Sequence, residues 1–202
     1  ISENGEMFGE EYTLVAVADY VLKHTPGNTV SNLSSSRALK DVTEAYGQQY
    51  HAAAVGEVNV VAEMKRTHSV IGGEGNGGVI YPESHYGRDA LVGVGLFLSH
   101  YVAQSKKMTE LKSTYPPYFI SKNKMTLSPD MDVDKILEGL KERYATEKVT
   151  DIDGVKIDFA QGWVHLRKSN TEPIIRIYSE AKDEAAANQL AEEVIAAAKS
   201  TL

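Results

Sequence analysis

Along the first half of the chain, short apolar runs alternate with stretches in which apolar residues recur every three or four positions. The recurrence of Tyr12, Val15, Ala16 and Tyr20 predicts a helix over residues 10–22 that packs on one face. The same patterns predict strands over residues 29–33, 49–54, 69–71 and 79–82, and helices over residues 36–46, 59–64 and 90–102. Strands that alternate with helices indicate an α/β layer domain.

The first eight residues carry a hairpin signal. Asn4-Gly5 is a strong turn dipeptide, so residues 1–8 predict a strand, a turn and a second strand. A protein seldom begins inside a strand that has to pair, and we therefore expect this chain to be part of a longer protein.

The remainder of the chain carries more strand signals. Strands are expected over residues 118–125, 151–157, 163–166 and 174–178, with an Asp-Gly turn in the second of them, and helices over residues 132–144 and 183–199. Pro116 and Pro117 break regular structure, so residues 113–117 are the expected linker. The acids of residues 130–134 are interpreted as helix-start residues rather than as metal ligands.

Composition removes several classes of function. The net charge is -7, whereas a nucleic-acid-binding chain usually has a basic face, so we expect no nucleic-acid partner. The absence of cysteine excludes disulfides, thiolate metal sites and a cysteine nucleophile, and is compatible with a reducing cytoplasm, the expected location. No apolar run approaches the roughly 20 residues of a membrane span, so we expect no membrane partner.

Residues 72–78 form a glycine-rich stretch that contains the G-x-G-x-x-G spacing of dinucleotide-binding proteins. That fingerprint requires a helix at its end, but a strand-like run ending in Pro82 follows here, so dinucleotide binding is rejected. Glycines also let the backbone approach a polyhydroxylated ligand closely, with Glu74 accepting hydrogen bonds and Asn76 donating or accepting them. A flexible glycine loop without a ligand is the alternative.

Polar turn residues separate the last two predicted strands. Ser169, Asn170 and Thr171 offer hydroxyls, an amide and backbone N–H groups, and such donors in a tight turn form a concave site for an anion. Arg167 and Arg176 flank the turn, and a guanidinium group matches two phosphate oxygens at once. The sequence therefore predicts either a phosphate-binding loop or an ordinary hairpin with charged flanks.

The string Arg-x-Ser-Asn-Thr-Glu-Pro followed by Ile-Ile-Arg, which starts at Arg167, resembles the phosphate-binding loop of the α-D-phosphohexomutases. In that family the loop lies in the last of four domains and holds the substrate phosphate that is not transferred. The resemblance implies that Arg167, Ser169, Asn170 and Thr171 contact phosphate and that Arg176 supports them. Many family members have Gly in place of Asn170, and both residues tolerate left-handed backbone angles.

Glu74 lies in a stretch similar to the family's sugar-binding loop, Gly-Glu-x-Ser-Gly, with Asn76 in place of the usual serine. Glu57 follows Gly56 at the expected start of a helix, where an acid is either a favourable first-turn residue or a ligand for a substrate hydroxyl or amine. The surroundings of Glu57 look most like the phosphoglucosamine mutase branch of the family. An acid there would suit an ammonium group electrostatically.

The resemblance covers essentially the whole chain. Residues 1–112 are similar to the family's third domain, a mixed-sheet α/β/α domain. Residues 118–202 are similar to its C-terminal domain, a small α+β domain with a TATA-box-binding-protein-like antiparallel sheet and helices on one side. The family's catalytic phosphoserine and Mg²⁺ loop belong to earlier domains. We therefore expect no catalytic residue and no metal site in these residues, Mg²⁺ on the missing upstream part, and the chain's own N-terminal domains as partners.

The activity that the resemblance implies is the interconversion of hexose 6-phosphate and hexose 1-phosphate through a phosphoserine enzyme and a bisphosphate intermediate. The expected ligand is a hexose or hexosamine phosphate. Phosphoglucosamine mutase is the favoured branch, phosphomannomutase/phosphoglucomutase the alternative, and a non-catalytic phosphosugar-binding module the rival from another class. By itself the chain is expected to be inactive, because the phosphoserine and the metal loop are absent.

Overall fold

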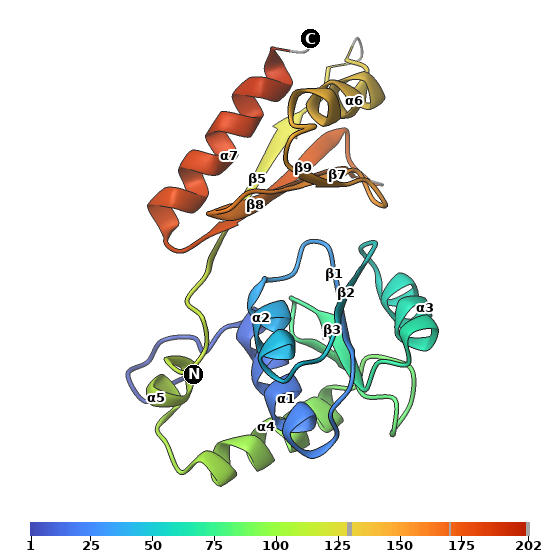
Figure 1. Cartoon of the computed structure of the whole chain (residues 1–202). Helices are drawn as coiled ribbons and strands as arrows, with labels where there is room; N and C mark the ends of the chain where they lie inside the picture. Colours follow the sequence, from blue (N-terminus) through green and yellow to red (C-terminus); the bar gives the residue numbers. More distant parts are fainter. Residues whose placement is uncertain (129–130, 170, 201–202) are drawn as a thin grey trace. The chain divides into compact units, whose positions relative to one another are not determined.

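The structure, a computed structural model, describes residues 1–128, 131–169 and 171–200. The chain separates into two compact units, Ile1–Pro117 and Tyr118–Leu202. Each unit has its own sheet, so each is described by itself (Figure 1). No helix in the described part of the chain is long and apolar enough to cross a membrane.

The first unit is a four-stranded mixed sheet in the order β2-β1-β3-β4. Its strands are β1 (Thr29–Asn32), β2 (Tyr50–Ala53), β3 (Ile71–Glu74) and β4 (Gly78–Ile80). The first three strands are parallel, and β4 runs antiparallel to β3. As a result, the carboxyl ends of β1, β2 and β3 lie at one edge of the sheet.

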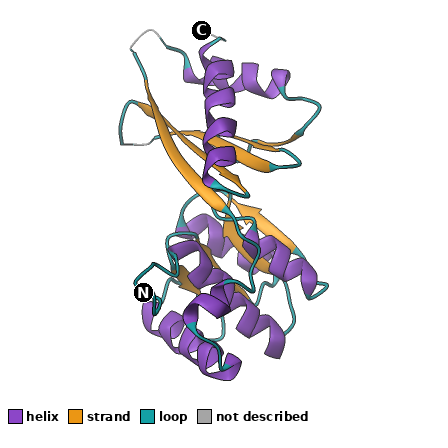
Figure 2. Cartoon of the chain, turned by 90° about the vertical axis from the view of Figure 1, so that its left-hand side faces the viewer, coloured by secondary structure: helices purple, strands orange, loops and turns teal. Residues whose placement is uncertain are grey.

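Helices cover both faces of this sheet (Figures 1 and 2). They are α1 (Glu10–His24), α2 (Ala38–Ala45), α3 (Glu57–Thr67), α4 (Ala90–Gln104) and the short α5 (Met108–Lys112). α3 packs on one face, where Met64 and Val60 join Val30, Ala53 and Ile80 in a buried cluster. α1 packs on the other face and contacts α2 and α4. The α/β layer domain that the alternating pattern predicts is confirmed, and the mixed sheet between helices is the arrangement that the family resemblance implies.

Two local predictions for the first unit are wrong. Residues 1–8 form the expected turn, with Gly5 at a φ of 84°, but no strands flank it, because Ser2 N bonds directly to Glu6 O (2.8 Å) and closes a tight loop. The strand expected over residues 69–71 instead begins at Ile71 and continues through two glycines. Residue 72 of this strand is glycine because a Cβ there would lie 2.8 Å from the Val30 carbonyl oxygen of β1 and 2.6 Å from the Met64 sulfur of α3.

The second unit is an antiparallel sheet in the order β5-β9-β8-β7-β6. Its strands are β5 (Phe119–Thr126), β6 (Lys148–Thr150), β7 (Val155–Asp158), β8 (Gly162–Lys168) and β9 (Ile174–Ala181). Helices α6 (Val133–Arg143) and α7 (Glu184–Lys199) pack on one face of the sheet over a buried apolar cluster (Figure 1). The strand predicted over residues 151–157 is too long: the turn at Gly154, with a φ of 72°, is confirmed, but β7 begins only after it, and β6 lies outside the predicted strands.

Aspartates begin several helices. Asp132 accepts hydrogen bonds from the backbone N–H groups of Asp134 and Lys135 at the start of α6, which confirms the helix-start interpretation for that acid. Asp130 lies outside the described residues. Asp89 begins α4 in the same way, accepting from Leu91 N and Val92 N.

Candidate functional site

Polar side chains gather at the carboxyl edge of the parallel strands in the first unit. Asn32 ends β1 and Glu74 ends β3. The buried Glu74 carboxylate accepts hydrogen bonds from Asn32 Nδ2 (2.9 Å) and from Gly56 N (3.2 Å), just beyond β2. Ligands of open α/β sheets bind at this edge, where strand ends converge.

Asn32 also fixes the loop that follows β1. Its Oδ1 accepts hydrogen bonds from Ser34 N (2.9 Å) and Ser35 Oγ (3.1 Å). The Ser35 hydroxyl accepts in turn from Gly75 N (2.8 Å), immediately after Glu74. This closed network holds the Glu74 carboxylate in one orientation.

The glycine after Glu74 leaves room for the carboxylate of Glu11. A Cβ at Gly75 would lie 2.0 Å from Glu11 Oε1. The other oxygen of Glu11 accepts a hydrogen bond from Ser36 N (2.8 Å), which anchors the turn before α2. The glycine-rich stretch is a hairpin that joins β3 to β4, and Gly75 in it packs against the Glu11 carboxylate. The predicted strand after the glycines is confirmed as β4, so the stretch does not open the helix that the dinucleotide fingerprint requires.

Glu57 and Arg88 form an ion pair beside this network. Glu57 Oε1 accepts from Arg88 N (2.9 Å) and Glu57 Oε2 from Arg88 Nε (2.8 Å). The hydrogen bond from the Arg88 backbone, followed by that from its side chain, lowers the pKa of Glu57. Arg88 Nη1 also lies 3.5 Å from Glu74 Oε2, so one guanidinium group spans both acids.

An open depression of about 470 Å³ lies against the Glu57–Arg88 pair. Asn76 is exposed at its wall, and its side-chain oxygen accepts a hydrogen bond from Gly78 N (3.1 Å). Carboxylates, an amide and a guanidinium around an open depression offer both acceptors and donors to sugar hydroxyls. Of the residues predicted for the sugar, Glu57 and Asn76 line the depression, and Glu74 is joined to it through Arg88.

In the second unit, the turn between β8 and β9 holds the residues predicted for phosphate. Ser169 N donates to Ile174 O (3.0 Å) and closes the turn, and Thr171 N lies 3.4 Å from Ser169 Oγ. The two hydroxyl oxygens are 3.5 Å apart. Asn170 lies outside the described residues. The hydroxyls of Ser169 and Thr171 are thus neighbours, as an anion-binding loop requires.

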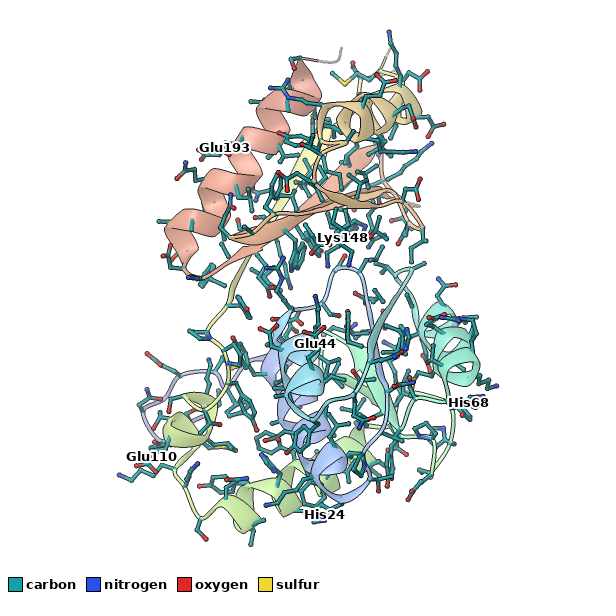
Figure 3. The ribbon with its side chains drawn as sticks, in the orientation of Figure 1. His24, Glu44, His68, Glu110, Lys148 and Glu193 are labelled. Carbon is teal, nitrogen blue, oxygen red and sulfur yellow. The ribbon has the colours of Figure 1, made fainter. Side chains whose placement is uncertain are left out.

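Three cations form a row across neighbouring strands beside this turn. The register pairs Lys124 on β5 with Arg176 on β9, and Arg176 with Arg167 on β8. Directly paired residues point to the same face of a sheet, and here that face is the one opposite the helices. Figure 3 shows the side chains of this sheet, with Lys148 labelled at its β6 edge.

The row contains an unsatisfied donor. Arg176 Nη2 bonds to Glu172 Oε2 (3.0 Å) within the turn. Arg167 Nε, a buried atom, has no hydrogen-bond partner among the described residues. Like charges directly opposite each other destabilise a sheet, so an anion bound between the two arginines and the turn would remove both costs.

Sequence reasoning missed three residues of these sites. Arg88 and Asn32 lie 14 and 42 positions from Glu74, and Lys124 lies far from the turn that it faces. A polar residue at the end of a buried strand was the available signal for Asn32. Lys124 and Arg88 carried no local signal, because their placement follows from strand register and from the path of the loop after β4.

Two models of known protein domains match this chain. Residues 9–118 match the model of the phosphoglucomutase/phosphomannomutase alpha/beta/alpha domain III, and residues 122–197 match that of the phosphoglucomutase/phosphomannomutase C-terminal domain. The chain belongs to the phosphoglucomutase/phosphomannomutase family, that is, to the C-terminal half of the α-D-phosphohexomutases.

Two curated relatives are each 36% identical to this chain. The phosphoglucomutase/phosphomannomutase of Thermococcus kodakarensis is 36% identical over 195 residues, which are 95% of this chain and 42% of the relative. The phosphoglucosamine/phosphogalactosamine mutase of Sulfurisphaera tokodaii is 36% identical over 82% of this chain and 37% of the relative. The chain therefore spans less than half the length of these relatives.

Solved structures share the fold. A phosphoglucomutase/phosphomannomutase family protein from Burkholderia thailandensis superposes with a TM-score of 0.81 at 22% identity, covering 98% of this chain and 43% of the other. The N-acetylphosphoglucosamine mutase of Aspergillus fumigatus, solved with GlcNAc-6P and magnesium, gives a TM-score of 0.59 at 14% identity, covering 94% and 46%. At these identities the likeness shows the fold alone.

Proposed function

We propose that this chain is the sugar- and phosphate-binding half of a phosphohexose mutase. The whole enzyme would interconvert hexose 6-phosphate and hexose 1-phosphate through a phosphoserine enzyme and a bisphosphate intermediate. The observation that carries the proposal is the row of Lys124, Arg176 and Arg167 beside the Ser169–Thr171 hydroxyls, with the Arg167 Nε donor unsatisfied. A phosphate dianion matches that set of donors in charge and in geometry.

The two units would divide the substrate between them. Unit 2 binds the phosphate that is not transferred, through Arg167, Ser169, Thr171 and the adjoining Asn170, with Arg176 as support. Unit 1 binds sugar hydroxyls through the carboxylates and amide around Glu74. Remote contacts of this kind orient the sugar, and orientation is a large part of the rate enhancement in phosphoryl transfer.

The transfer step belongs to other residues. We assign the phosphoserine and the Mg²⁺ loop to the part of the longer relatives that this chain does not match, and expect no mutase turnover from the 202 residues alone. Mg²⁺ there would neutralise charge on the transferring phosphoryl group. Asp132, the middle acid of the Asp-rich run of residues 130–134, is used as a helix cap, so we assign it no metal.

For the sugar, we favour a hexosamine phosphate, with glucose or mannose phosphate as the alternative. Several relatives are named phosphoglucosamine mutase, which supports this choice. Contact between Glu57 and a substrate ammonium group has one condition, because the Arg88 guanidinium already compensates the Glu57 charge. Glu57 would meet a substrate ammonium group only if Arg88 shifts toward Glu74. The cysteine-free composition suits the cytoplasm, where we place the enzyme.

Replacing Glu74 tests the sugar site in the longer protein. Losing a charged hydrogen-bond acceptor costs about 1.5–3 kcal/mol, so Glu74→Ala should lower kcat/KM for hexose phosphate about ten- to a hundredfold. Steady-state kinetics measure the change, and a thermal melt checks that unit 1 remains folded. Glu44→Ala on α2 is the matched control, since that carboxylate is exposed and its ion-pair partner, Lys40, is outside the network.

An unchanged kcat/KM in folded Glu74→Ala protein would remove Glu74 from the site. Phosphosugar binding without any turnover in the longer protein would instead favour the non-catalytic module.

A further inference from the structure

Helix α4 has the wrong surface for a solvent-facing helix. Its 15 residues include no Asp, Glu, Lys or Arg. One side is packed: Gly93 lies against Val79, and His100 bonds to Tyr115 (2.8 Å). A helix that has one buried side normally presents charged and polar residues on the other, whereas a helix that is apolar all round is buried all round.

The open side of α4 forms a continuous apolar stripe. Leu91, Val94, Leu98 and Val102 are 85%, 56%, 52% and 73% exposed, at helical spacings of three and four residues. Between them Gly95 is open, with no atom within 4 Å of a Cβ placed there. We call these five residues the α4 face.

Two small residues, Gly95 and Ser99, lie beside the large side chains of the α4 face. The hydroxyl of Ser99 donates back to Gly95 O (2.8 Å), so it presents no free donor at the surface. A ridge of large side chains beside a row of small ones is the kind of surface against which another helix packs. The shape thus fits a packed helix better than bulk solvent.

A cavity of about 400 Å³ continues the α4 face toward the N-terminal segment. It is lined by Ile1, Phe8, Val94, Phe97, Leu98 and Met108 among others. The rings of Phe8 and Phe97 meet edge to face with centroids 5.1 Å apart. The N-terminal segment therefore runs along the border of the α4 face, so polypeptide preceding residue 1 would leave the structure beside it.

We propose that the α4 face is the docking surface for a helix of the domain that precedes domain III in the longer relatives. Those relatives match this chain over less than half of their length, and the matched parts are domain III and the C-terminal domain. Interfaces between domains of one chain typically bury about 600–1,500 Å². The α4 face and the cavity beside it supply an apolar centre for such an interface.

Two other occupants fit less well. A helix that lies in a membrane surface carries basic residues on its polar side, and α4 has none. A second copy of the chain would pair two α4 faces about a two-fold axis. Such pairing depends on protein concentration, whereas docking of a domain of the same chain does not. The proposal depends on family membership and not on the sugar or phosphate contacts, so their failure would leave it standing.

Cysteine labelling tests the proposal cleanly, because the chain has no native cysteine. Leu98→Cys and Val102→Cys place thiols on the α4 face, and Val58→Cys, 81% exposed on α3, is the control. Maleimide labelling rates are compared between the 202-residue chain and the same chain extended by the part of its gene that precedes residue 1, with any added cysteines replaced by serine. In the extended protein the labelling rate of the α4 thiols should fall by about tenfold or more, because labelling then requires local opening. The labelling rate of Val58→Cys should stay the same.

Equal rates at the α4 face in both proteins would overturn the proposal, as would a gene with no coding sequence before residue 1. Slow labelling in the dilute 202-residue chain would also overturn it, because the face would then be covered within this chain. Protection that appears only as the concentration of the short chain rises, and is absent in the extended protein, would assign the α4 face to a second copy.

Discussion

Leu166→Ala should lower the free energy of unfolding of the second unit by about 2–5 kcal/mol. Leu166 is fully buried in the apolar cluster between the sheet and the helices α6 and α7. Truncation removes transfer free energy and leaves a cavity that the β-sheet cannot close, because its neighbours are fixed by the ladder on both sides. The substitution also sits directly before Arg167, so it loosens the strand that positions the phosphate turn.

Urea unfolding followed by tryptophan fluorescence measures this change selectively, since the single tryptophan, Trp163, belongs to the same strand. Ile152→Ala is the matched control, because Ile152 is 56% exposed in the turn before β7. The control should shift the free energy by less than about 0.5 kcal/mol. Similar losses for both variants would show that Leu166 is not at the centre of the core.

Arg167→Ala should weaken the binding of inorganic phosphate about ten- to a hundredfold. A hydrogen bond to a charged group contributes about 1.5–3 kcal/mol, which converts to that range at about 1.4 kcal/mol per tenfold change. Arg167→Lys should recover only part of the loss, because lysine keeps the charge but lacks the planar fork that holds two phosphate oxygens. Isothermal titration of the 202-residue chain at low ionic strength measures all three proteins.

Lys168→Ala provides the control for simple charge. Lys168 is the next cation along β8, and alternation along a strand turns it to the opposite face from Arg167. Its loss should change the affinity for phosphate by a few-fold or less, through long-range attraction that added salt screens. Equal losses at the two positions would mean that net charge, and not a built site, attracts the anion.

The long helices could be predicted because their apolar residues recur with the period of a helix. The final helix to Lys199 buries one regular stripe, so a single sequence sufficed. The helix from Glu10 was found in the same way, but it buries every residue from Leu14 to Ala18 and is therefore covered on more than the one face that its pattern predicts. β3 could not be found in the same way. Its glycines look like a loop, and only the approach of Met64 and of the Gly78 backbone shows why a strand there tolerates no side chain.

In the candidate sites, residues that are close in sequence could be predicted, and residues brought together by the fold could not. Ser169, Thr171 and Arg167 are local in sequence, so a short string was enough to suggest a phosphate loop. Lys124 reaches that loop only through the β5–β9 register, and Arg88 reaches Glu57 across 31 residues. Chemistry assembled by strand pairing or by loop paths leaves no local pattern, and for that reason the cations that complete both sites required the structure.

Titration of phosphate into isotope-labelled chain, followed by the backbone amide resonances, is the most direct test of phosphosugar binding. The amides of Ser169 and Thr171 should shift first, with that of Asn170, because the donors of this turn are local and need no other part of the protein. Glucosamine 6-phosphate should then also move the amides of Gly56 and Gly75, which bond to the carboxylate and hydroxyl of the sugar network. If the amides of the turn stay unchanged at saturating phosphate while distant ones move, the turn is an ordinary hairpin and the proposed site does not exist.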